Sequence, residues 1–293
     1  MDRIPESELI LDSRGGVYHL GLRPEEIAPT VFLVGDPGRV KAVSRYFDRI
    51  EFECQHREFI THTGYIGSKR LSVISTGIGP DNIDIAVNEI DALANIDFES
   101  RTVKASLSSF ELIRLGTSGS LQADIPVDSF VAGTHGLGFD NVMHFYQKEN
   151  TPAEIDLVEA FKLHTGLTSG NVLPYVFAGS TKLLDLFADK YVHGITIGCP
   201  GFFGPQGRIL RLPLAYPGLV DKLSHFRHQE HYISNFEMES SAIYGLGRLL
   251  GHQCVSLNVI VANRVTKQFS TDAAKAVDNL IQHSLNILAS TPL

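Results

Sequence analysis

The sequence predicts an α/β fold, and three features of its pattern support this class. Short apolar, β-branched runs alternate with amphipathic stretches, and several of these runs end in glycine. The runs are almost continuously apolar, which is typical of strands that helices cover on both faces. Because no repeat, low-complexity tract or long Pro/Gly/Ser linker divides the chain, we expect residues 1–293 to form a single domain.

Five apolar runs give the clearest predicted strands. They span Thr30 to Val34, Leu71 to Ser75, Phe110 to Leu115, Ser129 to Ala132, and Val255 to Ala262. Residues 98–109, which are polar, and residues 212–232, which are rich in His and mixed charge, are expected to be surface excursions. We interpret the histidines of the second excursion as a solvated helix face, because zinc sites need fixed ligand spacing, usually with a thiolate or carboxylate in register.

Three helices have recognisable starts or ends. Apolar residues recur on one face from Ile83 to Ala94, and Asp81 or Asn82 is the expected cap of this helix. A second helix is predicted from about Glu239 to Leu250, with Gly251 as its stop signal. The last predicted helix begins near Ser270-Thr271-Asp272, and its core-facing stripe consists of Ala273, Val277, Leu280, Ile281, Leu285 and Leu288.

The composition and charge of the chain indicate which partners and which cellular compartment to expect. Hydrophobic residues make up 43% and charged residues 20% of the chain, as in ordinary folded proteins. The net charge of −8 argues against non-specific binding to nucleic acid or an anionic membrane, because both need a basic surface. Without a signal-peptide pattern or an apolar stretch of membrane length, we expect a cytoplasmic protein. Cys54, Cys199 and Cys254 lie in apolar surroundings and are interpreted as buried thiols in a reducing compartment.

Glycine-rich segments follow three of the predicted strands. Gly35 to Arg39 is a turn whose backbone N–H groups can approach an anion, with Arg39 able to close on it, although an ordinary turn has the same sequence. The other two segments are 75–80 and 114–119. Ligands of open α/β sheets bind where strand ends meet helix N-termini. None of the three segments has the pattern for a nucleoside triphosphate or a dinucleotide, so we expect a small anion.

Arg114 stands out because it falls at the end of an apolar run. An unpaired guanidinium is costly to bury there, so Arg114 needs either a bound anion or a carboxylate in a structural salt bridge. Glu237 and Glu239 open a predicted helix, where carboxylates can cap the helix or accept hydrogen bonds from a sugar diol. Gln206 and Arg208 together offer donors and an acceptor that fit the carbonyl and imide edge of uracil, although a polar loop has the same pattern.

Taken in order, these motifs resemble those of the nucleoside phosphorylase family, which includes uridine and bacterial purine nucleoside phosphorylases, and in particular its uridine branch. The similar segments are 18–22, 35–39, 56–59, 75–79, 114–119, 202–208, 237–239 and 260–264. The resemblance covers nearly the whole chain. It implies a three-layer α/β/α fold with a central mixed, twisted sheet, and a transferase that splits a nucleoside with inorganic phosphate as co-substrate and no metal or organic cofactor.

The resemblance also assigns roles to individual residues. It implies a phosphate site formed by Gly35, Arg39, Arg114 and Thr117, with Arg57 supplied by a neighbouring subunit. The nucleoside site would consist of His19, also from the neighbour, together with Thr117, Phe202, Gln206, Arg208, Glu237, Met238, Glu239 and Arg264. Arg114, Gln206, Arg208 and Glu239 are the residues expected to take part in catalysis. A shared site requires a homo-oligomer, either a dimer or a hexamer.

The expected base is a pyrimidine. Bacterial purine enzymes of the family have an aspartate near the end of the late strand that can protonate the purine, whereas the present strand has no aspartate until Asp272. Uridine is therefore the expected substrate. The alternatives are another nucleoside, such as thymidine, deoxyuridine or a purine nucleoside, and a nucleoside-binding protein that has lost catalysis. Pro80-Asp81-Asn82 departs from the common family pattern, so the resemblance does not extend to the intersubunit alkali-metal site near Glu58 and Ile78.

Overall fold

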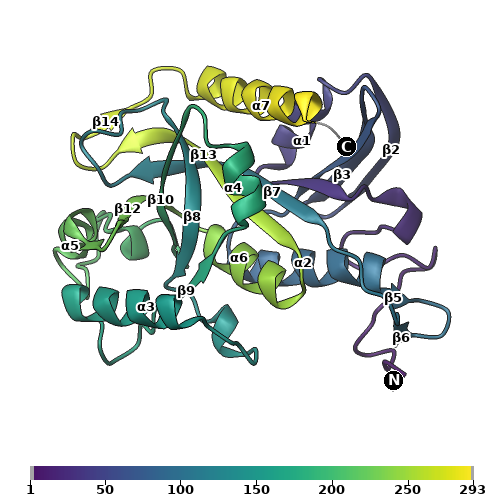
Figure 1. Cartoon of the computed structure of the whole chain (residues 1–293), viewed down its shortest axis with the longest axis horizontal. Helices are drawn as coiled ribbons and strands as arrows, with labels where there is room; N and C mark the ends of the chain where they lie inside the picture. The colour runs from purple at the N-terminus through teal and green to yellow at the C-terminus, as the bar shows by residue number, and fades with distance from the viewer. Residues whose placement is uncertain (1–2, 292–293) are drawn as a thin grey trace.

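The computed structural model describes residues 3–291 and confirms the predicted α/β fold (Figure 1). Within these residues, twelve strands join in one mixed sheet, along the path β11-β12-β10-β8-β13-β7-β1-β4-β3-β2, with β9 and β14 paired to β8 and β13. Strands β5 and β6 form a separate two-stranded hairpin. That residues 1–293 form a single domain stays a prediction.

The elements have the following bounds. The strands are β1 (Thr30–Val34), β2 (Arg49–His56), β3 (Phe59–Ile66), β4 (Lys69–Ser75), β5 (Ile96–Asp97), β6 (Thr102–Val103), β7 (Glu111–Ser120), β8 (Phe130–Gly138), β9 (Tyr175–Ala178), β10 (Tyr191–Gly198), β11 (Arg227–His228), β12 (His231–Glu237), β13 (Gln253–Asn263) and β14 (Gln268–Phe269). The α-helices are α1 (Pro37–Ser44), α2 (Pro80–Asn95), α3 (Pro152–Thr165), α4 (Thr181–Leu186), α5 (Leu219–His225), α6 (Ser240–Leu249) and α7 (Ala273–Ser290).

The centre of the sheet is parallel, and its strands end at one edge. β1 pairs in parallel with β4 and β7, and β7 pairs in parallel with β13. β12 then approaches β7 from the other direction, with Asn235 opposite Ser120 and Phe236 opposite Gly119. Because parallel strands end at the same edge, the segments that follow β1 and β4 meet the distal half of β7 and the end of β12.

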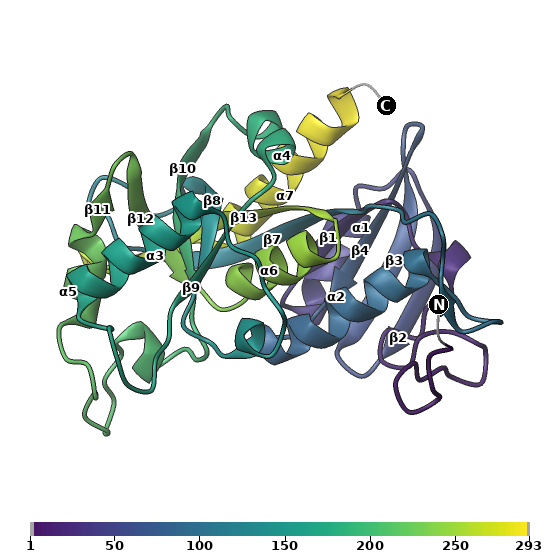
Figure 2. The same cartoon turned by 60° about the horizontal axis from the view of Figure 1, so that its bottom comes forward.

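Helices cover both faces of this centre and give the expected three layers (Figures 1 and 2). Alternate residues of β1 point to opposite faces, as a pleated strand requires. Val31 and Leu33 pack in the core that includes residues of α2 and α6. Phe32 and Val34 pack in the core that includes residues of α1, α4 and α7. Both faces of β1 are buried, which explains its continuous apolar sequence.

Several predicted boundaries are corrected by the structure. The run expected to end at Leu115 continues as β7 to Ser120, so residues 114–119 are strand and not a loop. Neither Asp81 nor Asn82 caps α2; Gly79 occupies the cap position, and Pro80 is the first helical residue. The histidines of segment 212–232 do not share a helix face, because they are divided among α5, β11 and β12. Nine strands were not among those predicted, namely β2, β3, β5, β6, β9, β10, β11, β12 and β14.

The structure bears on the expectations for the cysteines, for membrane-spanning segments and for segment 98–109. Cys199 and Cys254 are buried, Cys54 is only partly buried, and none of the three forms a disulfide. Across residues 3–291, none of the helices combines the length and the apolar character needed to span a bilayer. Segment 98–109 is largely exposed, apart from Arg101, whose guanidinium donates to the carbonyls of Ile4, Pro5 and Leu9.

Candidate active site

A cavity of about 280 Å³ lies where β1, β7, β12 and β13 meet the segment 202–208. It brings together most of the site residues expected from the sequence. Those that line it are Gly35, Arg39, Arg114, Thr117, Phe202, Gln206, Arg208, Glu237, Met238 and Glu239. Three expected residues, His19, Arg57 and Arg264, are not part of its wall.

One end of the cavity carries two guanidinium groups. Asp36 caps α1 by accepting a hydrogen bond of 2.8 Å from the Gly38 N–H, and this turn points Arg39 toward β7. There Nη1 of Arg39 donates to the carbonyl of Leu115 at 3.1 Å. Burial lowers the pKa of Arg39, and the positive charge of Arg114 lowers it further. Two like charges in a partly desolvated cavity favour an anion between them, so this end suits phosphate.

Arg114 itself is almost fully buried on β7 and has three partners. Its Nη1 donates to Oδ1 of Asn258 at 2.8 Å, and its Nη2 forms ion pairs with Glu237 at 3.1 Å and with Glu239. Burial acts against its charge, but the two carboxylates outweigh burial and raise the pKa of Arg114. The structure shows the salt-bridge alternative for Arg114, whose guanidinium is held by carboxylates and also lines the cavity. Binding of an anion by Arg114 stays a prediction.

The two glutamates have different local roles. Glu237 accepts hydrogen bonds from the N–H groups of Glu239 and Ser240, so it caps the start of α6. Glu239 instead accepts from the N–H of Gly79 at 2.8 Å, which fixes the loop before α2 against α6. Burial raises the pKa of Glu237 to about 7, and the neighbouring carboxylate of Glu239 adds to the rise, although Arg114 opposes it. The Glu237 carboxyl therefore titrates near neutral pH.

The opposite end of the cavity is formed by a short turn around η3 (Gly204–Gln206). The Arg208 guanidinium lies 3.7 Å from the centroid of the Phe202 ring, and its Nη1 donates to Oε1 of Gln206 and to the Phe202 carbonyl, both at 2.6 Å. Arg264 does not line the cavity, but its Nη1 donates to the Gln206 carbonyl at 3.0 Å. Burial lowers the pKa of Arg208 to about 10, with a further contribution from Arg264. This end therefore presents an amide, a guanidinium and an aromatic face together.

His19 and Arg57 lie outside the wall of the cavity. Nδ1 of His19 lies 2.7 Å from Oε1 of Glu89, and the His19 N–H also donates to that carboxylate. Arg57 occupies the β2–β3 turn with φ of 55°, and its guanidinium lies 5.8 Å from the Tyr18 ring centroid. Their contribution to a shared site stays a prediction.

Sequence reasoning missed some members of the wall and its support. Phe236 and Ser118 line the cavity, and Asn258 holds Arg114 from β13. The polar residue Asn258 within the apolar run 255–262 was the available signal, because buried polar groups need partners. In the part of the chain that the structure describes, no group of three or more His, Cys, Asp or Glu side chains is arranged to hold a metal ion.

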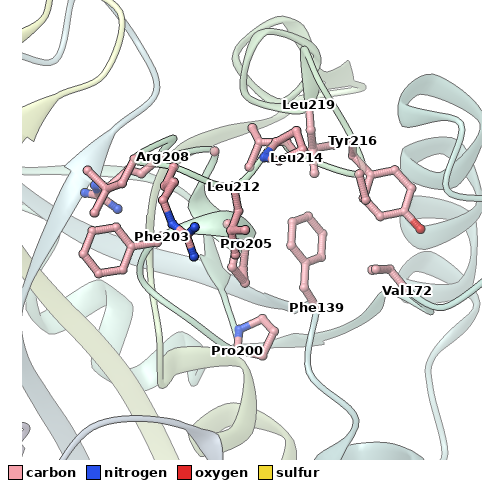
Figure 3. Close-up of a pocket in the computed structure, with 16 residues that line it drawn as sticks. Phe139, Val172, Pro200, Phe203, Pro205, Arg208, Leu212, Leu214, Tyr216 and Leu219 are labelled. Carbon is pink, nitrogen blue, oxygen red and sulfur yellow. The ribbon is translucent and has the colours of Figure 1, made fainter.

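A larger, mainly apolar cavity of about 630 Å³ adjoins the part of the first cavity that contains Arg208 (Figure 3). Its labelled walls include Phe139, Leu212, Leu214 and Tyr216, and Arg208 stands at the boundary between the two cavities. Segment 212–232 thus begins as one wall of this cavity, and the segment is not only a surface excursion.

Comparison with known proteins places the chain in a family. The chain is 27% identical to the uridine phosphorylase of Thermococcus kodakarensis over 292 residues, covering 99% of this chain and 92% of the relative. It is 25% identical to the uridine phosphorylase of Escherichia coli over 284 residues, covering 94% and 96%. A crystal structure of a Trypanosoma brucei nucleoside phosphorylase, whose description reports uridine phosphorylase activity, superposes with a TM-score of 0.89 at 30% identity, covering 97% of this chain and all of that one. Because residues 29–289 also match the family model of the phosphorylase superfamily, the chain belongs to that superfamily.

Proposed function

We propose that the protein is a uridine phosphorylase, a pentosyltransferase that converts uridine and inorganic phosphate into uracil and ribose 1-phosphate. One observation carries the proposal. The wall of a single cavity contains two guanidiniums, those of Arg39 and Arg114, together with Glu239, which is ion-paired with Arg114, and the Gln206–Arg208 pair. These groups suit an anion, a sugar diol and a pyrimidine, respectively.

Phosphate is the nucleophile in the proposed reaction. An oxygen of phosphate forms a bond to C1′ of the ribose while the bond from C1′ to N1 of uracil breaks. Arg39 and Arg114 hold the phosphate, and Glu239 accepts hydrogen bonds from the ribose hydroxyls. Holding both reactants in one cavity makes the encounter close to intramolecular, which lowers the barrier. The reaction needs no metal or organic cofactor.

The leaving base takes the electron pair of the broken bond. The resulting negative charge spreads over the uracil carbonyls, where donors of Gln206 and Arg208 stabilise it. Because these two side chains already bond each other at 2.6 Å, they need little reorganisation when the charge develops. Preorganised donors of this kind typically contribute about 3 kcal/mol each when removed singly.

The residues that β13 contributes to the cavity wall favour a pyrimidine over a purine. The wall contributed by β13 consists of Val261 and Ala262, neither of which can protonate a purine ring. The uridine phosphorylases of Thermococcus kodakarensis and Escherichia coli, which align with most of this chain, support this preference by their names. Thymidine and deoxyuridine remain the alternatives that this wall accepts.

The proposal also includes an assembly and a cellular setting. A homo-oligomer, a dimer or a hexamer, would let His19 and Arg57 of one subunit complete the site of another. Localisation in the cytoplasm and a role in pyrimidine nucleoside salvage complete the proposal. Gel filtration with light scattering measures the assembly, and a monomer with full activity would contradict the shared site.

One assay tests the function. The purified protein is incubated with uridine, thymidine or inosine, each with and without phosphate, and the release of base is followed. We expect uracil to be released fastest, and only when phosphate is present. Faster release from inosine would point to a purine enzyme, and binding of uridine without any release would point to a non-catalytic binding protein.

A further inference from the structure

Asn258 is buried beside Arg114 and does not line the cavity. It lies on β13, where Ser256 pairs with Arg114 and Asn258 pairs with Gly116 of β7. Glycine at 116 leaves the space through which the two side chains meet, because a Cβ there would lie 1.5 Å from Nη1 of Arg114 and 2.6 Å from Oδ1 of Asn258. Arg114, Asn258 and Gly116 therefore form one fitted contact across two strands.

The orientation of the Asn258 amide is determined by its neighbours. Arg114 has only donors, so Oδ1 must face its Nη1, and Nδ2 then donates to Oγ of Ser256 at 3.1 Å. The hydroxyls of Ser256 and Ser240 lie 2.6 Å apart, and the Ser240 N–H donates to Glu237. Since Glu237 pairs with Arg114, these bonds form a closed ring around the guanidinium.

The neutrality of Asn258 matters for the charge of the site. Arg114 already has two carboxylate partners, Glu237 and Glu239, so its positive charge is largely balanced before any ligand arrives. A third carboxylate would hold the guanidinium as well as an amide does, but it would repel an anion bound to Arg114. An amide holds Nη1 in place without adding negative charge.

We propose that Asn258 is a positioning residue that holds the guanidinium of Arg114 at the anion end of the cavity without adding negative charge that would repel phosphate. The proposal rests on the proposed function, in which Arg114 binds phosphate. Asn258 contributes two properties in this proposal, a fixed geometry and the absence of negative charge, and a different substitution removes each of them.

Asn258→Ala removes the fixed geometry, and Asn258→Asp keeps an oxygen acceptor but adds charge. We expect Asn258→Ala to raise the KM for phosphate roughly tenfold, the effect of losing one hydrogen bond at a charged group. Asn258→Asp should raise it by roughly the same factor, because the added carboxylate repels the anion. In both variants the KM for uridine should stay within about twofold of wild type. Phosphate binding is also measured directly by isothermal titration calorimetry. In the Arg114→Ala background, Asn258→Ala should have no further effect on phosphate affinity, because Asn258 acts through Arg114.

A matched control is Asn95→Ala, which removes another buried asparagine amide, on α2 and outside the cavity. It should leave the KM for phosphate unchanged, even if the protein becomes less stable. Wild-type phosphate affinity in Asn258→Asp would overturn the requirement for neutrality. Additive losses in the double variant would overturn the positioning role. If the wild-type protein released no uracil, the proposed function would fail, but the calorimetric titrations with phosphate would still test Asn258.

Discussion

The closest test of the anion end is the substitution Gly116→Ala, which adds one methyl group under the Arg114 guanidinium. The added Cβ would lie 1.5 Å from Nη1 and 2.5 Å from Cζ of Arg114. Nonbonded heavy atoms approach to about 3.5 Å, so the tip of the side chain must move by about 2 Å. Gly116 lies within β7 and lacks a positive φ, so its backbone accepts alanine and only the side-chain clash remains.

The size of the effect follows from the contacts that this movement breaks. The 2.8 Å bond from Arg114 to Asn258 and the 3.1 Å contact with Glu237 cannot both survive a displacement of that size. A hydrogen bond to a charged group contributes about 1.5–3 kcal/mol. Losing one such contact with phosphate lowers kcat/KM for phosphate by roughly 10- to 150-fold. The KM for uridine should change little, because the base-binding end is built from segment 202–208.

Steady-state kinetics with phosphate and uridine varied separately measures this split. Gly204→Ala is the control, because its added Cβ meets no atom within 4 Å. Thermal unfolding of both variants identifies any general loss of stability. Phosphate kinetics of Gly116→Ala equal to those of wild type would refute the placement of Arg114 over Gly116 and its role with phosphate.

Two further predictions concern the other groups of the cavity. Arg208→Ala should lower kcat/KM for uridine by roughly 100-fold, because it removes one preorganised donor, while phosphate affinity measured by calorimetry stays unchanged; equal losses in both would contradict a base-binding role. The raised pKa of Glu237, about 7, predicts that anions bind more tightly below pH 7, where the carboxyl is protonated, and more weakly above it. Inhibition by sulfate, measured from pH 5.5 to 8.5, tests this prediction, since sulfate keeps its charge across that range. The variant Glu237→Gln should show inhibition that does not depend on pH. If inhibition of that variant still changed with pH, the titration would belong to another group.

The sequence was most informative where a strand is buried on both faces. Thr30 to Val34 was predicted with its observed bounds, because every residue of β1 after the first is buried and apolar. β2, in contrast, lies at the end of the sheet path and is exposed along much of its length. Its sequence, Arg-Ile-Glu-Phe-Glu-Cys-Gln-His, therefore lacks the continuous apolar signal that revealed the central strands.

Glycine was the main source of error around the site. Gly116 and Gly119 suggested a loop, yet both lie inside β7. Their small size serves side chains that approach the strand closely: a Cβ at 119 would lie 3.0 Å from the Phe236 ring, just as one at 116 would meet Arg114. In a strand, glycine often marks close approach of another group, and this cannot be distinguished from a turn by local sequence alone.

The sequence by itself determined the α/β class and the central strands, and its resemblance to a known family indicated ten of the residues that line the cavity. Local patterns suffice for the class and the strands, because burial on a sheet and the ends of helices impose periodicities and residue types that can be read along the chain. Only the tertiary structure decided that Glu237, Glu239 and Asn258 share one guanidinium, that of Arg114. Those contacts cross from β7 to β12, α6 and β13, and their distances depend on how the strands pair, which no local stretch of sequence contains.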